Sequence, residues 1–268
     1  MPATVAPRTP AGGQFLVFMP LVQVSGQQKA HTKKGVGLTY TDCPTATAAG
    51  AAWQYGWSPS PAACAGVENI PMMWGAGDVN ATLGGNSQWI MGFNEPDSAS
   101  QANLSPANAA TLWRQIEQAY PTRKLAAPAP SGGNTTWLPA FRQAYISAYG
   151  TAPRLDALEV HCYAWSASAC IQFTQVYEGW ASSWGVPEVW VSEFSISPSA
   201  PNTLSQSLQE AQTYINWLEA DSMITRFAWF ASKLQGTEAW VPPTFITPLT
   251  DWNTGQLTTF GTMYVPFR

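Results

Sequence analysis

Charged residues are scarce in this sequence. Asp, Glu, Lys and Arg make up 10% of its 268 residues, whereas average soluble proteins contain about 25%. The 12 basic residues are outnumbered by 16 acidic residues, which gives a net charge of −4, and they form no basic stripe. The sequence therefore lacks the electrostatic surface of a nucleic-acid-binding protein. Its polar surface must come from uncharged side chains such as Ser, Thr, Asn and Gln.

Residues that bind transition metals are also few. The sequence contains two histidines, His31 and His161, and its four cysteines form no CxxC pair. This composition argues against a zinc site. No heptad run, low-complexity tract or repeat of solenoid length is present either, which excludes coiled-coil and repeat architectures. Hydrophobic residues nevertheless make up 46% of the chain, enough for one large domain with a full core.

The four cysteines allow three disulfide pairings. Cys162 and Cys170 flank a short polar loop, and Cys43 and Cys64 bracket another segment. We therefore expect two local disulfides, with free buried thiols as the alternative. Disulfides are typical of secreted proteins, and several Asn-X-Ser/Thr sequons fit the same compartment. We expect the protein to be secreted, outside the cell or in the cell wall.

The N-terminal segment has some features of a secretory signal. An apolar run, Phe15–Val24, follows Arg8 and ends in small residues, and it is too short to span a bilayer. Pro20 within the run and the long, weakly charged leader argue against this interpretation. We assign residues 1–32 to a signal-like or flexible leader and residues 33–268 to one folded domain.

From Lys34 onward, short apolar runs alternate with amphipathic patterns. This alternation predicts parallel strands connected by helices. The best-marked helix has Ser105 as its N-cap and Pro106 at its first position. The predicted strands are Gly35–Tyr40, Trp53–Trp57, Ile70–Trp74, Trp89–Phe93, Leu125–Ala129, Ala157–Tyr163, Val189–Phe194 and Thr225–Phe230, and the predicted helices include Pro106–Tyr120, Trp137–Tyr149, Ile171–Trp184 and Leu204–Asp221.

Eight predicted strands in a domain of this length favour an α/β fold of the compact (β/α)8 TIM-barrel type. An open, doubly wound sheet is the alternative. Such a sheet normally has a glycine-rich phosphate-binding turn after its first strand, but Gly35-Val36-Gly37 lies within the strand and lacks the third glycine. We therefore expect the barrel.

Two of the predicted strands end in a glutamate. Glu95 follows the fourth strand in the segment Asn94-Glu95-Pro96, and Glu193 lies near the end of the seventh. A TIM barrel places its active site at these strand ends. Glycoside hydrolysis needs two carboxyl groups there, a protonated one to assist the leaving oxygen and an ionised one to attack the anomeric carbon. Asn-Glu-Pro alone is often only a turn, because Pro96 restricts the residue before it; the pairing with Glu193 is what favours catalysis.

Other candidates have simpler explanations. Asp42, Asp78 and Asp97 also follow strands, but Asp in such places is usually a turn or cap residue. His161 could equally be a hydrogen-bonded core histidine.

Tryptophan and tyrosine are abundant, with 14 and 9 copies. The tryptophans on helices are expected to pack in the core. Those at strand ends are expected to face the cleft, where flat rings can stack on the apolar faces of pyranose sugars: Trp57, Trp74, Trp165 and Trp229.

The glutamate segments resemble a known group of enzymes. Gly92-Phe93-Asn94-Glu95-Pro96 together with Ser192-Glu193-Phe194 resembles the clan A glycosidases. Three further segments are similar to glycoside hydrolase family 128, whose members are mostly β-1,3-glucanases from fungi and bacteria. They are Lys34-Gly35-Val36-Gly37-Leu38-Thr39-Tyr40, Val160-His161-Cys162-Tyr163 and Arg226-Phe227-Ala228-Trp229-Phe230. The resemblance extends from Lys34 to the C-terminus.

This resemblance implies a role for individual residues. Glu95 would be the acid/base and Glu193 the nucleophile, and Asn94 would bond the 2-hydroxyl of the sugar. Tyr163 and His161 would orient Glu193. The floor of the subsite for the reacting sugar would be Trp229, with Tyr40, Trp57, Trp74 and Trp165 as further substrate-binding residues.

The resemblance also implies a retaining endo-β-1,3-glucanase that acts on β-1,3-glucan and needs no metal and no cofactor. Nothing in the sequence suggests an obligate oligomer, so we expect a monomer, without nucleic-acid or membrane partners. An exo mode or a different linkage is an alternative within enzymes. A catalytically silent glucan-binding cell-wall protein is an alternative from another class. The presence of both Glu95 and Glu193 argues against the silent binder, because binding alone needs neither.

Overall fold

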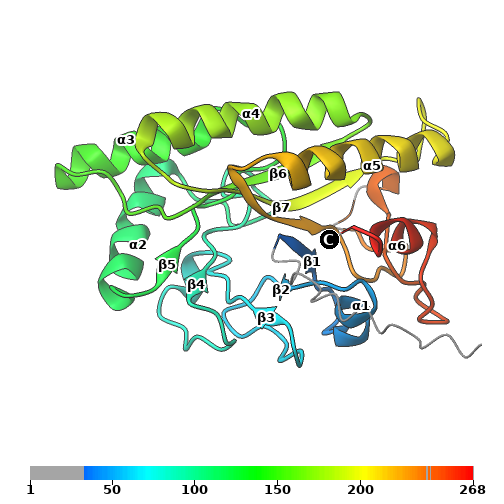
Figure 1. Ribbon diagram of the computed structural model, residues 1–268. Coiled ribbons are helices and arrows are strands. Elements are labelled where there is room, and N and C mark those ends of the chain that lie inside the picture. Colours follow the sequence, from blue (N-terminus) through cyan, green and yellow to red (C-terminus); the bar gives the residue numbers. More distant parts are fainter. Residues whose placement is uncertain (1–32, 240, 242, 268) are drawn as a thin grey trace, which may run out of the picture.

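The computed structural model (Figure 1) describes residues 33–239, 241 and 243–267. The predicted leader, residues 1–32, lies outside the described residues. Within them the chain forms an α/β fold with a parallel sheet of six strands, in the order β3-β2-β1-β8-β7-β6, and a second parallel pair, β4-β5. The strands are β1 (Lys34–Gly37), β2 (Trp53–Tyr55), β3 (Glu68–Asn69), β4 (Trp89–Ile90), β5 (Lys124–Leu125), β6 (Leu158–Ala164), β7 (Val189–Ile196) and β8 (Ile224–Trp229).

Single bridges connect the two sheets. Met72, which follows β3, pairs with Met91, which follows β4, and Ala126 after β5 pairs with Ala157 before β6. The predicted third strand, Ile70–Trp74, lies after β3, which spans Glu68–Asn69, and contains a single bridge at Met72. Pro71 lies two residues after Asn69, and a proline has no N–H to donate to a strand ladder.

The helices cover the sheet unevenly. α3 (Trp137–Tyr149), α4 (Ala167–Trp184) and α5 (Leu204–Ala220) lie along one side of β6 and β7, with α2 (Pro106–Ala119) beside β4 and β5 (Figure 1). Around β1–β4 the described residues form only α1 (Cys43–Ala48) and the 3-10 helix η1 (Ala76–Asp78); a second 3-10 helix, η2 (Pro243–Phe245), and α6 (Thr259–Tyr264) follow β8. The strict strand–helix alternation predicted from the sequence thus holds for the C-terminal half.

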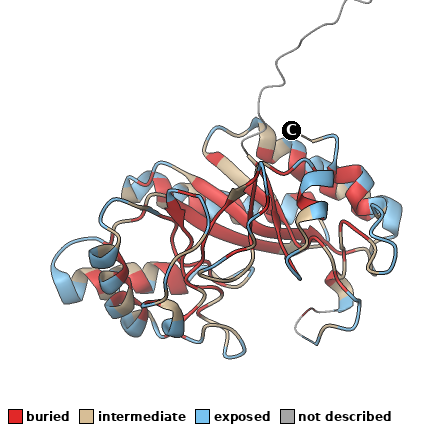
Figure 2. Cartoon of the chain, turned by 90° about the horizontal axis from the view of Figure 1, so that it is seen from below, coloured by how far each residue is buried: buried red, intermediate tan, exposed pale blue. Residues whose placement is uncertain are grey.

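Side chains of the strands alternate between two apolar layers. We call the face of the sheet covered by helices the outer face and the opposite one the inner face. On β7, Val189 and Val191 pack in the large core on the outer face, whereas Trp190 joins a smaller inner cluster with Trp53 and Trp89. Figure 2 shows the buried strands between helices whose other sides are exposed. This alternation follows from the two-residue period of a strand.

Aromatic rings fill the inner face near the beginnings of the strands. The rings of Trp89 and Trp190 have centroids 4.5 Å apart, and those of Trp53 and Trp190 5.7 Å apart. The guanidinium of Arg226 lies 4.7 Å from the Trp190 ring and forms a 2.8 Å ion pair with Glu68. The N-terminal ends of the strands are thereby closed by packing, which leaves the C-terminal ends for a cleft.

Two local features agree with the sequence predictions. Cys43 pairs with Cys64 and Cys162 with Cys170, so both expected disulfides are confirmed. α2 begins at Pro106, and the hydroxyl of Ser105 accepts a hydrogen bond from the backbone N–H of Asn108 at 3.2 Å. None of the helices in the described part of the chain combines the length and apolar character needed to cross a bilayer.

Candidate active site

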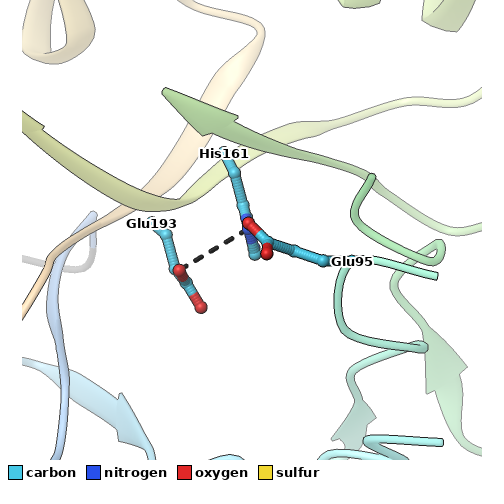
Figure 3. A group of neighbouring side chains, drawn as sticks. All are labelled: Glu95, His161 and Glu193. Carbon is cyan, nitrogen blue, oxygen red and sulfur yellow. Dashed lines mark hydrogen bonds and ion pairs between the residues drawn. The ribbon is translucent and has the colours of Figure 1, made fainter. Parts of the chain in front are cut away.

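Three polar side chains meet at the C-terminal ends of β4, β6 and β7. Glu95 follows β4, His161 lies on β6 and Glu193 lies on β7. Figure 3 shows the two glutamates approaching His161 from opposite sides. The Nδ1 atom of His161 lies 3.2 Å from Oε1 of Glu95 and 3.5 Å from Oε2 of Glu193. The two predicted glutamates and the predicted histidine thus form one cluster.

Glu193 is held by several hydrogen-bond donors. Its Oε1 accepts bonds from the Tyr55 hydroxyl at 3.0 Å and the Trp57 indole N–H at 2.7 Å. Its Oε2 accepts a bond from the Tyr163 hydroxyl at 2.6 Å. The register of β7 against β6 and β8 shifts at this point, and such an irregularity can re-aim a side chain.

Opposing effects act on the Glu193 carboxyl. Burial is the largest effect and raises its pKa overall, and the nearby Glu95 carboxylate adds to the rise. The charge of His161 and the hydrogen bonds from Tyr163 and Trp57 act to lower the pKa. Hydrogen bonds donated to a carboxylate favour its ionised form, so this ring of donors is suited to keeping a buried carboxylate charged.

Glu95 is held much more loosely. Within the described residues its side chain contacts only His161 through a hydrogen bond, and 17% of it is exposed. Its backbone has a φ of 41°, in the left-handed region, which costs a non-glycine residue about 1–3 kcal/mol. The backbone N–H donates to the carbonyl of Ala129 at 2.8 Å. Such strain is typical of functional sites, and Pro96 contributes to it by disfavouring the right-handed helical region for Glu95.

His161 is completely buried. Burial acts to lower the pKa of its imidazole, but the carboxylates of Glu193 and Glu95 outweigh this effect and raise the pKa to about 9. The ring is therefore an imidazolium at neutral pH, and its Nδ1–H donates toward the carboxylates.

One oxygen of each glutamate and a ring nitrogen of His161 lie within 4.8 Å of one another, close enough for a shared metal ion. A metal ligand must be a neutral imidazole, so the chemistry of this donor set does not favour a metal.

A cleft of about 630 Å³ opens above these residues. This volume lies in the range of small-molecule sites. Four further predicted residues line it, namely Asn94, Trp57, Trp74 and Tyr163. The amide Nδ2 of Asn94 donates to Gln101 at 3.2 Å, and its buried Oδ1 has no partner in the described part of the chain. That oxygen is available to accept a bond from a ligand hydroxyl.

Trp229 does not line the cleft, so the prediction that it forms the floor of a sugar subsite is wrong. Its side chain is completely buried in the outer core, where its ring lies 5.2 Å from that of Phe194, and its indole N–H donates to the carbonyl of Thr247 at 2.7 Å. The next residue, Phe230, lines the cleft instead. Because side chains alternate between the two faces of a strand, an error of one residue exchanges core for cleft.

Two other predicted residues lie outside the cleft lining. Trp165 is 40% exposed and packs against Phe245, a lining residue, with ring centroids 5.5 Å apart. Tyr40 is 47% exposed, and its hydroxyl donates to Glu238 at 2.9 Å.

Sequence reasoning missed several residues of the site. Tyr55 lies within a predicted strand, two positions before Trp57, and the period of a strand places both on the inner face. That spacing was the available signal. Gln101 lies in a connecting segment and Phe245 in the short 3-10 helix η2, where no periodic pattern marks a side chain that faces the cleft.

Comparison with known proteins agrees with this geometry. Residues 36–264 match the family described as glycosyl hydrolase catalytic core. No curated protein sequence matches the chain. Among solved structures, a family 128 subgroup I endo-β-1,3-glucanase from Amycolatopsis mediterranei, in complex with laminaripentaose, is 26% identical, with a TM-score of 0.70 over 88% of this chain and 100% of that one.

Two more solved structures represent other subgroups of family 128. A subgroup II endo-β-1,3-glucanase from Pseudomonas viridiflava is 27% identical, with a TM-score of 0.69 over 88% of this chain and 98% of that one. A subgroup III curdlan-specific exo-β-1,3-glucanase from Blastomyces gilchristii is 25% identical, with the same TM-score and the same coverage. The chain therefore belongs to the glycosyl hydrolase catalytic-core family and is a glycoside hydrolase of family 128.

Proposed function

We propose that this protein is a retaining endo-β-1,3-glucanase in which Glu193 is the nucleophile and Glu95 the acid/base. The observation that carries the proposal is the spacing of the two carboxyl groups across His161. One oxygen of each lies within 4.8 Å of the other. Retaining enzymes separate their carboxyl groups by about 5–5.5 Å, whereas inverting enzymes need about 6.5–9.5 Å to admit a water molecule.

The division of roles follows from the hydrogen bonds. Glu193 accepts three bonds from neutral donors, which favour a fixed, ionised carboxylate, as a nucleophile requires. Glu95 is partly exposed and has one partner, so it is free to give a proton to a leaving group and take one from water. Its contact with His161 fixes its position without removing that freedom.

The reaction then takes two steps. Glu95 donates its proton to the glycosidic oxygen while a carboxylate oxygen of Glu193 forms a bond to the anomeric carbon, and the leaving glucan departs as an alcohol. A water molecule next enters; Glu95 takes its proton, and the hydroxyl attacks the anomeric carbon and displaces Glu193. Two inversions give net retention. The His161 imidazolium offsets the repulsion between the two carboxylates whenever both are ionised.

The cleft supplies groups for the sugar. The free Oδ1 of Asn94 is suited to accept a bond from a sugar hydroxyl near the reacting carbon. Trp74 and Phe230 line the cleft, and their rings are suited to stack on pyranose faces. The substrate class comes from the solved relatives, which are β-1,3-glucanases crystallised with laminari-oligosaccharides or glucose.

Endo cutting is the mode of the subgroup I and II relatives, whereas the subgroup III relative is an exo-enzyme. The identities to the three differ little, so the endo mode rests on two subgroups against one.

We further propose that the strands close into a TIM-type barrel, a proposal supported by the single bridges that join β3 to β4 and β5 to β6. The two disulfides support secretion, and we propose that the protein acts as a monomer.

Product analysis tests the activity. The purified protein would be incubated with linear β-1,3-glucan, mixed-linkage glucan, cellulose and xylan, and the products separated by chromatography. A ladder of β-1,3-oligosaccharides from the first substrate is expected; glucose alone would indicate exo action. If the protein sediments with insoluble glucan but releases no sugar, it is a glucan-binding protein rather than an enzyme.

The stereochemistry needs a separate measurement. Proton NMR of the first products, taken before mutarotation, should show the β-anomer. An α-anomer would mean inversion and would remove the nucleophilic role from Glu193.

A further inference from the structure

β6 carries a third polar residue of the inner face that the proposed reaction does not use. Glu159, His161 and Tyr163 alternate with Val160 and Cys162, which pack in the outer core. The two-residue period of the strand places the three polar side chains in one row. Tyr163, nearest the cleft, bonds Glu193, and Glu159 lies one step below His161. Glu159 is 1% exposed.

A carboxyl group this deep is costly unless it is paired or bonded. The hydrogen bond to Glu159 that the described structure contains comes from the backbone N–H of Gly92 to Oε1, at a long 3.4 Å. Oε2 has no partner among the described residues. Gly92 lies three positions before Glu95 on the segment that follows β4, so this bond connects Glu159 on β6 to the segment that carries Glu95.

Two other buried polar atoms in this region also lack partners within the described chain. They are Nε2 of His161 and Oγ of Ser192, and Ser192 directly precedes Glu193. An acceptor, a ring nitrogen and a hydroxyl are thus left on three residues next to the catalytic groups.

Electrostatics couple the same groups. The carboxylate of Glu159 contributes, with those of Glu193 and Glu95, to the raised pKa of His161. Burial raises the pKa of Glu159 itself to about 7, although Ser192, His161 and Gly92 act to lower it.

We propose that Glu159 is a positioning residue for catalysis, which acts on the Nε2 side of His161 and thereby directs its Nδ1–H toward Glu95 and Glu193. The imidazole has two nitrogens, and the bond made by one decides what the other can do. An ionised carboxylate on the Nε2 side accepts the Nε2–H and favours the doubly protonated imidazolium, which keeps the proton on Nδ1 that faces the two glutamates. The kinetic consequence rests on the proposed function; the state of the His161 ring does not.

The test is an NMR titration of the histidine ring nitrogens in the whole protein. The chain has two histidines, so a His31→Gln variant assigns both signals. Glu159→Gln removes the charge but keeps the shape of the side chain. Removing a nearby anion destabilises the imidazolium, so the pKa of His161 should fall by about one unit. Glu178→Gln is the matched control, because burial likewise raises the pKa of Glu178 to about 7, and in the described part of the chain the carboxyl that acts on it is that of Asp221, which is not a cleft residue.

Activity gives the second readout. At about pH 6, His161 should be charged in both forms, whereas at about pH 9 it should be largely neutral only in Glu159→Gln. The loss of kcat relative to the unsubstituted protein should therefore be several-fold larger at the higher pH. A variant that is merely less well packed would lose activity by a similar factor at both.

An unchanged His161 titration in Glu159→Gln would overturn the proposal. If that variant does not fold, a titration of the unsubstituted protein still tests the proposal. The Nε2 signal of His161 should shift near pH 7, where Glu159 takes up a proton, and again near the pKa of His161. The lack of a shift near pH 7 would contradict the proposal. A shifted titration in a protein that releases sugar from no glucan would instead refute the proposed function and leave the positioning role intact.

Discussion

The two walls of the cleft hold their glutamates in opposite ways. On the β7 wall, Glu193 is nearly completely buried and accepts bonds from Tyr55, Trp57 and Tyr163. On the β4 wall, Glu95 has a strained backbone, a partly exposed side chain and one hydrogen-bond partner, His161. A group that must stay ionised and in place is surrounded by donors, and a group that must change its protonation is left room to do so.

The largest effect on activity should come from a change on the β7 wall. Glu193→Gln keeps the shape of the side chain but removes the nucleophile, so kcat on β-1,3-glucan should fall by about 10⁴-fold or more. Binding of laminari-oligosaccharides, measured by calorimetry, should persist, because the cleft lining is unchanged. A variant that turns over normally would show that Glu193 is not the nucleophile and that its three donors serve the fold alone.

Activity should respond differently to the same kind of substitution on the β4 wall. Glu95→Gln removes the acid, so hydrolysis of natural glucan should fall by about 10³-fold. Aryl glycosides with good leaving groups need little acid assistance, and their bond cleavage should fall by only about tenfold. Kinetics on both substrate types measure this contrast. Equal losses on the two would assign Glu95 a role other than general acid.

Removing a single hydrogen-bond donor from the β7 wall should have an intermediate effect on activity. Tyr163→Phe removes the 2.6 Å bond to Glu193, which acts to lower the pKa of that carboxyl. The pKa should therefore rise, the acidic limb of the pH–rate profile should move to higher pH, and kcat should fall by about ten- to a hundredfold. Tyr145→Phe is the control, since Tyr145 is buried and bonded to Glu117 away from the cleft. An unmoved acidic limb would contradict the role of the donors.

The same contrast explains what the sequence could predict. Glu95 and Glu193 were identifiable because each follows an apolar run at the end of a strand, and the Asn-Glu-Pro segment strengthened the assignment. Trp229 was misplaced because the exact end of a β-strand decides which face a ring occupies, and here Phe230 is the residue that faces the cleft. Tyr55 could be placed by period alone, but its bond to Glu193 depends on β2 lying across from β7, a long-range arrangement that no local pattern encodes.

The length and limits of the short strands could not be predicted from the sequence pattern either. β3, β4 and β5 are two residues each, whereas the predicted apolar runs are five residues long; two of those runs overlap β4 and β5, but the third predicted strand begins one residue after β3 ends. Their pairing is continued by isolated bridges such as Met72 with Met91, so the runs mark the correct segments while overstating their regularity. The absence of long helices around β1–β4 in the described chain was likewise not predicted, because the connecting segments there are rich in Gly, Pro and Ser and bear no periodic signal.

The smallest effect is expected beyond the cleft lining. Trp165 is 40% exposed and touches the cleft only through Phe245, so Trp165→Ala should change kcat/KM on laminaritriose by less than about threefold, whereas Phe230→Ala, which removes a lining ring, should lower it by about tenfold or more. The same pair should be compared on long β-1,3-glucan. A larger loss for Trp165→Ala on the polymer than on the trisaccharide would extend the sugar-binding surface past the lining residues toward Phe245. Equal losses would confine recognition to the groove between the two glutamates, and the exposed ring would then serve to pack Phe245 in place.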